Sequence, residues 1–409
     1  MTKVFEKKVA ELNLDRSDWQ LVKFGDVAIQ QKQTVDRENT ELTRYVKGEH
    51  MYSEDIHLRK WGILKDEYLG PAFIRKFEEG DILYGSRRTY LRKVVIAPFK
   101  GITSNTTFVI KANENRIDKR LLPFVMLSEG FSQHSIKNSK GSVNPYVNWK
   151  DLSGFEFLLP SIEQQSDIIN LLCSMDTALQ KALQTQFQLE TASQAIFKNN
   201  LFIKNEGRDE VFLNKTSIFK VRNLEDLIDE AQYGISKSLS ENKEQGLPVL
   251  RMNNLQGGKL DLMNLKYYQG KKGELDSFIL KKGDVLFNRT NSFELVGKVS
   301  LFDDDGIYSF ASYLIRIRVD KSKLDPRFLN FYLNSSIGLS KVRKYRTPGV
   351  SQSNINAKNL KKIPVPLPDL EFQSSLMDQI EMFQVSEKSL NSKIKLSKKL
   401  QKSLINQVF

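Results

Sequence analysis

The sequence predicts a mixed α/β (α+β) protein built as a pseudo-two-fold internal repeat, in which each of two globular domains is followed by a long helix. Three observations predict this fold. One segment occurs twice, alternating runs rich in β-forming residues precede each copy, and a stretch without glycine or proline follows each copy. We expect the domains at 1–160 and 205–368 and the helices at 161–204 and 369–409.

The repeat is clearest around two Leu-Pro pairs. Residues 141–166 align with residues 349–374 at a constant offset (368 − 160 = 208), and nine of the 26 aligned positions are identical. The repeated unit exceeds the 20–50 residues of a solenoid repeat, so the chain carries a whole domain and its connector twice. Two similar units in one chain suggest a target that has two parts.

Each half opens with the same elements. A short helix with an apolar–acidic signature is predicted at 24–27 and again at 224–227. Alternating segments follow, punctuated by glycine turns. A Gly-Asp turn that enters a buried strand is predicted at Gly80 and, in the second half, at Gly283.

A helix is predicted farther along each half. Asp118 and Asp325 are expected to be N-cap residues, with Pro326 in the first turn of the second helix. The offsets between these matched elements range from 200 to 207 rather than 208. Insertions therefore lie in surface loops between the core elements.

The two glycine-free segments carry apolar residues at a seven-residue spacing. The first contains Ile168, Met175, Ala182, Leu189, Ile196 and Ile203, and the second repeats the phase with Leu376, Phe383, Leu390, Ser397 and Leu404. This spacing is typical of the seam of a coiled coil, here antiparallel because a whole domain separates the helices. At about 1.5 Å per residue, each helix would run on the order of 60 Å. The alternative is an independent amphipathic helix on each domain.

Composition limits the partner and the compartment. The net charge is +13 and the pI is near 9.4, which favours a polyanionic partner. No run approaches the ~20 apolar residues of a membrane span, and the N-terminus lacks an apolar signal core. Nucleic acid is therefore favoured over a membrane. Cys173 is the only cysteine, and a chain without a disulfide is expected to be cytoplasmic.

The sequence shows no catalytic motif, so we predict no catalytic residue and no metal site. Three scattered histidines and one cysteine disfavour a zinc site, and neither a phosphate loop nor a dinucleotide loop is present. The segment 144–147 is similar to the Asn-Pro-Pro-Tyr motif of adenine methyltransferases but lacks the second proline. Its counterpart at 352–355 lacks both prolines, so we interpret it as a structural loop.

The order of domain, Leu-Pro-x-x-Glu-x-Gln helix, domain and Leu-Pro-x-x-Glu-x-Gln helix resembles the specificity (S) subunit of type I restriction–modification systems. The resemblance covers essentially the full chain and also rests on residues 349–356 and 287–298. It implies a DNA-binding subunit that is not an enzyme. Each globular domain would be a target recognition domain for one half of a bipartite, interrupted site.

The resemblance also implies partners. The two helices would dock modification (methyltransferase) subunits, which carry S-adenosylmethionine, and restriction (translocase/endonuclease) subunits would bring ATP and Mg. The chain itself would hold no cofactor. The first half departs from the pattern, since residues 84–93 stand where the second half has its Asn-Arg-Thr-Asn run. That departure is expected if the two domains read different half-sites.

In the first domain the DNA-binding candidates follow the Gly80 turn and its strand. They are Arg87, Arg88, Tyr90, Arg92 and Lys93. The planar fork of arginine can bond guanine O6 and N7 together or clamp a phosphate. The alternative is a solvated edge strand whose charges deter aggregation. Lys140 and Ser142 lie in a basic loop that suits a phosphate, or that is an ordinary solvated turn.

In the second domain the candidates lie in a polar run and two flanking segments. The run contains Asn288, Arg289, Thr290 and Asn291, and the flanking candidates are Arg251, Asn253, Arg346 and Ser351. Asparagine can bond adenine N6 and N7, which suits base reading. The alternative is a polar turn between strands. Arg346 and Ser351 are expected to contact the DNA backbone, because phosphate contacts outnumber base contacts in most interfaces.

Two readings from other classes stay open. The chain could be a coiled-coil scaffold in which the basic charge is incidental, or a stand-alone DNA-binding protein. A nuclease whose acidic cluster cannot be seen in the sequence is the third alternative, because isolated aspartate and glutamate residues are common here.

Overall fold

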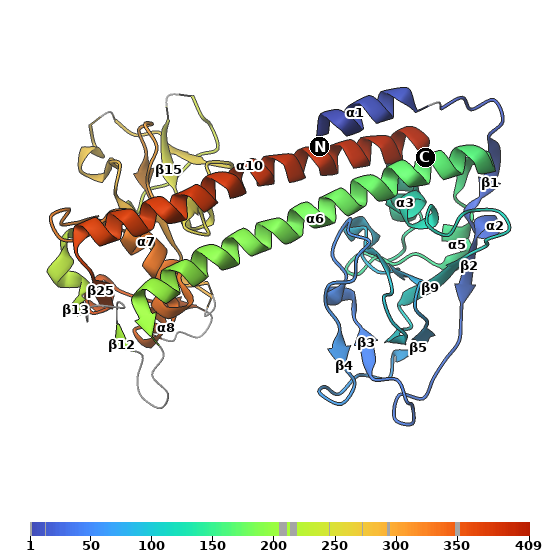
Figure 1. Ribbon diagram of the computed structural model, residues 1–409, viewed down its shortest axis with the longest axis horizontal. Helices are drawn as coiled ribbons and strands as arrows, with labels where there is room; N and C mark the ends of the chain where they lie inside the picture. Colours follow the sequence, from blue (N-terminus) through green and yellow to red (C-terminus); the bar gives the residue numbers. More distant parts are fainter. Residues whose placement is uncertain are drawn as a thin grey trace. The chain divides into compact units, whose positions relative to one another are not determined.

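The computed structural model describes residues 2–12, 14–203, 211–212, 219–244, 246–271, 273–292, 295–347 and 352–409. The contacts divide the chain into two units (Figure 1), of which unit 1 comprises the residues up to Thr185 together with Ser389–Phe409, and unit 2 comprises Gln186–Lys388. The helices α6 (Ile162–Leu201) and α10 (Leu370–Val408) each contribute one part to each unit. The predicted domain limits at 160 and 368 follow the repeat rather than these contacts and stay a prediction.

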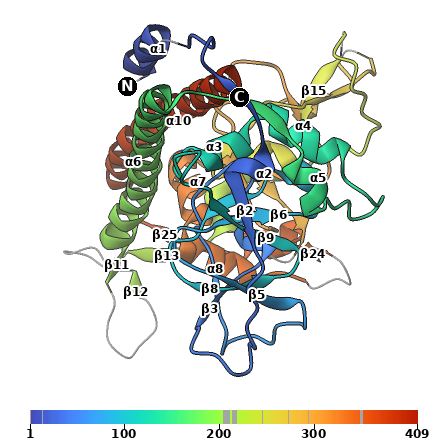
Figure 2. The ribbon, with the colours of Figure 1, turned by 90° about the vertical axis from the view of Figure 1, so that its right-hand side faces the viewer.

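Unit 1 contains two four-stranded sheets and one pair of strands. The first sheet has the order β2-β9-β6-β7, the second has β4-β3-β8-β5, and β1 pairs with β10. Figure 2 shows β2, β9 and β6 side by side. The strands are β1 (Gln20–Lys23), β2 (Ala28–Gln31), β3 (Arg44–Val46), β4 (Gly62–Ile63), β5 (Phe73–Phe77), β6 (Ile82–Gly85), β7 (Val94–Ile96), β8 (Gly101–Ser104), β9 (Thr107–Ala112) and β10 (Glu156–Leu159).

Unit 1 also contains short helices. They are α1 (Thr2–Glu11), α2 (Phe24–Val27), α3 (Leu122–Leu127), α4 (Glu129–Lys137) and α5 (Trp149–Ser153), with 3-10 turns η1 (Gly48–His50) and η2 (Thr89–Leu91). The predicted helix at 24–27 is confirmed as α2. The predicted N-cap at Asp118 is wrong, because α3 begins only at Leu122. The Asp118 carboxylate instead accepts a bond from the Arg120 backbone N–H (2.9 Å), within a turn before the helix.

Unit 2 repeats the sheets of unit 1. The sheet β14-β23-β19-β21 corresponds to β2-β9-β6-β7, β18-β15-β22 to the second sheet, and β13-β25 to the strand pair. The strands are β11 (Phe202–Ile203), β12 (Val211–Phe212), β13 (Lys220–Asn223), β14 (Ile228–Tyr233), β15 (Leu247–Leu250), β16 (Leu255–Gln256), β17 (Lys259–Leu260), β18 (Lys266–Tyr268), β19 (Val285–Asn288), β20 (Thr290–Asn291), β21 (Val299–Leu301), β22 (Ser309–Phe310), β23 (Leu314–Val319), β24 (Ser353–Asn354) and β25 (Pro364–Leu367).

The helices of unit 2 also follow the repeat. They are α7 (Pro326–Asn334), α8 (Ser336–Lys344) and α9 (Ala357–Lys361), with 3-10 turns η3 (Leu224–Leu227), η4 (Met252–Asn254) and η5 (Asp276–Phe278). The predicted cap at Asp325 is confirmed, since its carboxylate accepts a bond from the Arg327 N–H at the start of α7. The second signature helix is confirmed as η3.

The two Gly-Asp turns are confirmed and share one geometry. Gly80 and Gly283 have φ values of +85° and +93°, a left-handed conformation that glycine adopts without strain. Asp81 accepts a hydrogen bond from the Glu78 N–H (2.8 Å), and Asp284 accepts one from the Lys281 N–H (2.9 Å). Each turn therefore closes on its own aspartate and directs β6 or β19 into a core.

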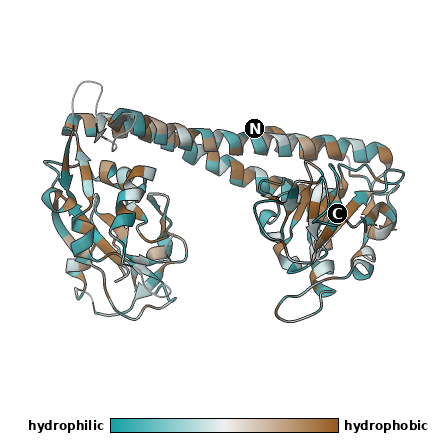
Figure 3. Ribbon diagram, turned by 90° about the horizontal axis from the view of Figure 1, so that it is seen from below, coloured by the Kyte–Doolittle hydropathy of each residue, from teal (hydrophilic) through white to brown (hydrophobic). Residues whose placement is uncertain are grey.

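The long helices join the core of each unit. In unit 1, Ile168 and Met175 of α6 and Leu404 of α10 are buried in one cluster with the residues of the first sheet. In unit 2, Leu376 of α10 is buried in the corresponding cluster, and Ile196 of α6 packs against it. Leu189, Phe383 and Leu390 are half-buried. Hydrophobic and hydrophilic residues are interspersed along the long helices (Figure 3).

Candidate nucleic-acid interface

The repeated segment folds back onto the residues that follow β6 in unit 1. The Val147 N–H donates to Ser86 O (3.0 Å), while Lys140 and Tyr146 exchange backbone hydrogen bonds (2.8 and 2.9 Å). These contacts hold residues 86–88, 140 and 145–147 together, and Arg87 pairs with Tyr146 across the resulting bridge. We call this set of backbone contacts the bridging frame.

Unit 2 builds the same bridging frame from the second copy of the segment. The Ile355 N–H donates to Arg289 O (2.8 Å), while Thr347 and Asn354 exchange backbone bonds (2.8 and 3.1 Å). Thr290 pairs with Asn354 in the β20–β24 ladder. The residues Arg87, Lys140 and Tyr146 therefore correspond to Thr290, Thr347 and Asn354, and we call these three places the frame positions.

Most predicted residues of the first domain lie on or beside the frame. Arg87, Arg88, Lys140 and Ser142 are exposed, and 52% of Tyr90 is exposed. Arg88 Nε donates to Asn144 Oδ1 (2.9 Å), and Lys140 Nζ lies 3.1 Å from a carboxylate oxygen of Asp151. The residues between Arg88 and Arg92 form the tight turn η2, so the alternative of an edge strand does not hold there.

Arg92 and Lys93 turn away from the predicted surface. Arg92 forms ion pairs with Glu129 (2.7 Å) and Glu54 (3.0 Å) and also donates to Leu127 O. Its guanidinium therefore ties three segments of unit 1 together, and the structure does not support a DNA contact by Arg92. Lys93 Nζ donates to Gly48 O, and burial lowers the pKa of its ammonium group.

A basic cavity of about 500 Å³ opens beside the frame of unit 1. Lys32, Arg75 and Arg87 line it, and no carboxylate is among its lining residues. Phe108, Tyr146 and Trp149 supply aromatic surface. A concave site with three cations and aromatic walls suits nucleic acid, because cations bind phosphates and aromatic rings pack on bases.

In unit 2 the frame gathers Arg289, Thr290 and Asn291. The Arg289 guanidinium lies over the Tyr233 ring (5.0 Å) and donates weakly to Asn354 Oδ1 (3.4 Å). Asn354 Nδ2 donates to Thr290 Oγ1 (3.1 Å). Asn291 Oδ1 accepts a bond from the Ser292 N–H (2.8 Å). These contacts orient the side chains before any DNA is present.

Asn288 is predicted to contact DNA, but the structure places it in the interior of unit 2. Its side chain is fully buried, because all four residues of β19 lie inside the unit. The structure therefore does not support a DNA contact by Asn288. Its Oδ1 faces the Thr290 N–H (3.4 Å) at the base of the frame.

The other predicted residues of unit 2 do not all join the frame. Arg251 and Asn253 lie at η4, where Arg251 donates to Asn264 O (2.8 Å). Arg346 follows α8 and donates to Arg343 O (3.2 Å), next to the frame position Thr347. Ser351 lies outside the described residues. The described residues of the chain contain no cluster of three metal-ligating side chains and no helix long and apolar enough to span a membrane.

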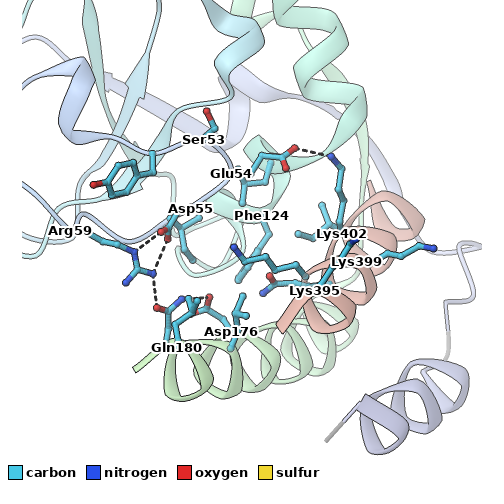
Figure 4. Close-up of a pocket in the computed structure, with 18 residues that line it drawn as sticks. Ser53, Glu54, Asp55, Arg59, Phe124, Asp176, Gln180, Lys395, Lys399 and Lys402 are labelled. Carbon is cyan, nitrogen blue, oxygen red and sulfur yellow. Dashed lines mark hydrogen bonds and ion pairs between the residues drawn. The ribbon is translucent and has the colours of Figure 1, made fainter. Parts of the chain in front are cut away.

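A second concave surface of unit 1 lies where the loop at 53–59 meets α6 and α10 (Figure 4). This cavity has a volume of about 780 Å³. Glu54 pairs with Lys402 (2.7 Å), Asp55 with Arg59 (2.6 Å) and Asp176 with His57 (2.8 Å). The Asp176 hydrogen bond raises the pKa of His57.

More lysines of α10 than carboxylates line this cavity. Lys395, Lys398 and Lys399 line it, and none of them has a carboxylate within ion-pair distance among the described residues. Lys395 points from α10 toward the loop (Figure 4). The apolar part of the lining comes from Ile56, Phe124, Leu127, Leu179, Leu183 and Ile405.

Sequence reasoning missed several residues of the two surfaces. Tyr146 and Asn354 lie at equal places in the aligned repeat (354 − 146 = 208), so the repeat could have indicated them. Lys32, which follows β2, and Arg75, which lies in β5, both line the basic cavity although they are far apart in the sequence. No local sequence pattern marks them.

Comparison with known proteins gives a family match. A family model described as the type I restriction modification DNA specificity domain matches the chain twice, over residues 16–189 and 217–402. These two matches confirm the internal duplication and cover most of the chain.

Three related proteins match part or most of this chain. The MjaVIII type I restriction enzyme specificity subunit of Methanocaldococcus jannaschii is 25% identical over 409 aligned residues, covering 93% of this chain and 88% of the relative. The EcoKI specificity subunit of Escherichia coli is 24% identical over 310 residues, and the match covers 71% of this chain and 66% of the relative. The MjaX protein of M. jannaschii is 28% identical over 194 residues, and that match spans 45% of its length.

Solved structures show the same fold. The S subunit of a type I restriction–modification system from M. genitalium superposes with a TM-score of 0.55 at 12% identity and covers 98% of each chain. A chain from a study of complex assembly and conformational transition of the type I R-M system gives a TM-score of 0.51 at 18% identity, covering 95% and 97%.

Proposed function

Because the chain belongs to the type I restriction–modification DNA specificity family, we propose that it is the DNA-reading subunit of a type I complex. Each unit would read one half of a bipartite, interrupted site. The observation that carries this proposal is the bridging frame, which is built twice with the same backbone bonds and with different side chains. A duplicated frame with changed side chains is what two different half-sites require.

Charge supports DNA as the target. The chain has a net charge of +13, and the basic cavity of unit 1 has no carboxylate in its lining. Neutralising phosphates with lysine and arginine supplies much of the affinity for duplex DNA. We therefore place Arg87, Arg88, Tyr90, Lys140 and Ser142 at the interface of unit 1. In unit 2 we place Arg289, Thr290 and Asn291 at the interface, with Arg346 beside them, and we propose Arg251 and Asn253 at η4 as further contacts.

The long helices would form an antiparallel coiled coil that spaces the two reading units. Within unit 1, Leu179 and Ala182 of α6 share a buried cluster with Ile394 of α10, and Leu183 and Leu390 pack against it. Nearer the start of α6, Ile168 and Met175 share a buried cluster with Leu404, which lies near the end of α10. The start of α6 therefore packs against the end of α10, which is the antiparallel order. An antiparallel pair of stiff helices would fix the number of unread base pairs between the half-sites.

Catalysis would reside in partner subunits. We propose that modification subunits carrying S-adenosylmethionine, and restriction subunits using ATP and Mg, assemble on this chain, which would itself only read the sequence. The cavity of Figure 4 would be the docking surface, because its lining has suitable chemistry. Its lysines favour an acidic partner segment, and its apolar lining would hold one hydrophobic side chain of that segment. We propose that a modification subunit provides it.

Charge reversal on α10 tests this docking surface. Lys395→Glu is expected to weaken assembly with the modification subunit by about tenfold or more, because a carboxylate would face the acidic segment. Lys393→Glu is the matched control, since Lys393 is exposed on the same helix and does not line the cavity. Sedimentation of the co-expressed complex measures assembly. Equal assembly of the two variants would contradict docking at this cavity.

Exchange of one reading unit tests the proposed function. Residues 1–160 are replaced by those of another family member, and the methylated site is mapped. We expect one half of the bipartite site to change while the other half and the spacing stay the same. A change in both halves, or in neither, would contradict modular reading.

A further inference from the structure

The two bridging frames share their backbone and differ in their chemistry. At the three frame positions unit 1 carries Arg87, Lys140 and Tyr146, whereas unit 2 carries Thr290, Thr347 and Asn354. Unit 1 therefore presents two cations and an aromatic ring where unit 2 presents three neutral polar side chains. The rest of the frame hardly varies, since the matched backbone bonds differ by no more than about 0.2 Å between units (3.0 against 2.8 Å; 2.8 against 2.8 Å; 2.9 against 3.1 Å).

The first frame position has the same setting in both units. Arg87 lies two residues beyond the end of β6 and Thr290 two residues beyond the end of β19, and each pairs with the repeated segment. Arg87 is exposed and forms no ion pair among the described residues, and it also lines the basic cavity. Lys140, by contrast, is already paired with Asp151. Arg87 is thus the cation of the frame that is available for a new partner.

Arg87 and Thr290 differ in what they can recognise on DNA. A free guanidinium in a rigid setting matches guanine, whose O6 and N7 accept two parallel hydrogen bonds in the major groove. A threonine cannot form that fork, but its hydroxyl and methyl group can meet a base edge or a thymine methyl. Thr290 is held for this role, because Asn354 Nδ2 donates to its hydroxyl (3.1 Å) and Arg289 in turn donates to Asn354 (3.4 Å).

We infer that the first frame position determines one base of each half-site, with Arg87 selecting a guanine in the half read by unit 1 and Thr290 selecting a different base in the half read by unit 2. This inference rests on the proposed function, because it assigns residues within the proposed DNA interface. The other frame positions would support that choice, with Tyr146 packing beside Arg87 and Asn354 fixing Thr290.

Selection from a duplex DNA pool tests the inference. The full-length chain is incubated with duplexes randomised across the bipartite site of the wild type, and the bound fraction is sequenced. Arg87→Ala is expected to lower the preference for one guanine, in one half-site, by roughly 5- to 150-fold, which corresponds to about 1–3 kcal/mol. Thr290→Ala is expected to relax one position of the other half-site only.

Arg116→Ala is the matched control. Arg116 is exposed and follows β9 at the end of that strand opposite the frame, so its removal deletes the same charge elsewhere on unit 1. We expect this variant to keep the wild-type preference at every position. Arg87→Lys is expected to keep part of the affinity but to weaken the guanine preference, because an ammonium group on a flexible stem lacks the planar, pre-organised fork of arginine.

The outcomes separate the inference from the proposed function. Equal loss for all sequences with Arg87→Ala would mark a phosphate contact and overturn the inference, as would an unchanged preference or a relaxation in both half-sites. In all these cases the wild type still selects a bipartite site. A wild-type chain that selects no sequence would instead overturn the proposed function.

Discussion

Replacing Leu404 by alanine is expected to lower the free energy of unfolding of unit 1 by about 2–5 kcal/mol. Leu404 lies near the end of α10, yet none of its surface is exposed and it belongs to the same buried cluster as Phe131 and Ile168. The rest of that cluster comes mostly from the first 175 residues of the chain. Truncation to alanine removes buried methyl groups and leaves a cavity that the neighbouring elements fill only in part.

Tryptophan fluorescence during urea unfolding measures this effect in unit 1 alone. The three tryptophans of the chain, Trp19, Trp61 and Trp149, all lie in that unit. Leu396→Ala is the matched control, because Leu396 is 46% exposed on the same helix, and its truncation is expected to change the free energy of unfolding by about 0.5 kcal/mol or less. Similar unfolding midpoints for the two variants would show that α10 is not part of the core of unit 1.

Replacing Gln373 by alanine is expected to destabilise unit 2 by about 3 kcal/mol or more. The Gln373 side chain is fully buried at the start of α10. Its Nε2 donates to Pro368 O (2.8 Å) and Lys323 O (3.0 Å), and its Oε1 accepts from the Asp325 N–H (2.8 Å). Truncation leaves these backbone groups without partners, and each buried unpaired group costs about 1–3 kcal/mol.

Hydrogen–deuterium exchange over α7 measures this loss, because Asp325 is the N-cap of that helix. Gln379→Ala is the control, since Gln379 is exposed on the same helix. The equivalent Gln165 forms two such bonds, to Pro160 O (3.0 Å) and from the Asp118 N–H (3.1 Å), so Gln165→Ala is expected to destabilise unit 1 by a smaller amount. If α7 exchanges at the wild-type rate in Gln373→Ala, the bonds do not hold the helix to the unit.

The repeated motifs could be predicted from the sequence because their causes are local. The turns at Gly80 and Gly283 need only a left-handed glycine and the aspartate that follows. The Leu-Pro-x-x-Glu-x-Gln motif was recognisable as a pattern, and the structure supplies its physical basis, the buried glutamine that joins the start of each long helix to the preceding domain.

Burial and long-range pairing could not be predicted in the same way. In the sequence, Asn288 resembles an exposed polar loop residue. In the structure it is the last residue of β19, and every residue of that strand is buried. Arg92 belongs to a run of cations, yet its partners Glu54 and Glu129 lie 38 (92 − 54) and 37 (129 − 92) residues away. The cavity of Figure 4 combines a loop with two helices more than 200 residues apart in the chain (395 − 180 = 215). Only the folded chain brings such groups together.

Mapping adenine methylation across the genome of the native host, with and without this gene, tests the proposed role as a sequence reader most directly. We predict that methylation at one bipartite, interrupted motif disappears when the gene is deleted and returns when it is restored. The two halves of that motif would be the sites of the two units. A methylation pattern that is the same in both strains would contradict the reading role and favour a scaffold built around α6 and α10.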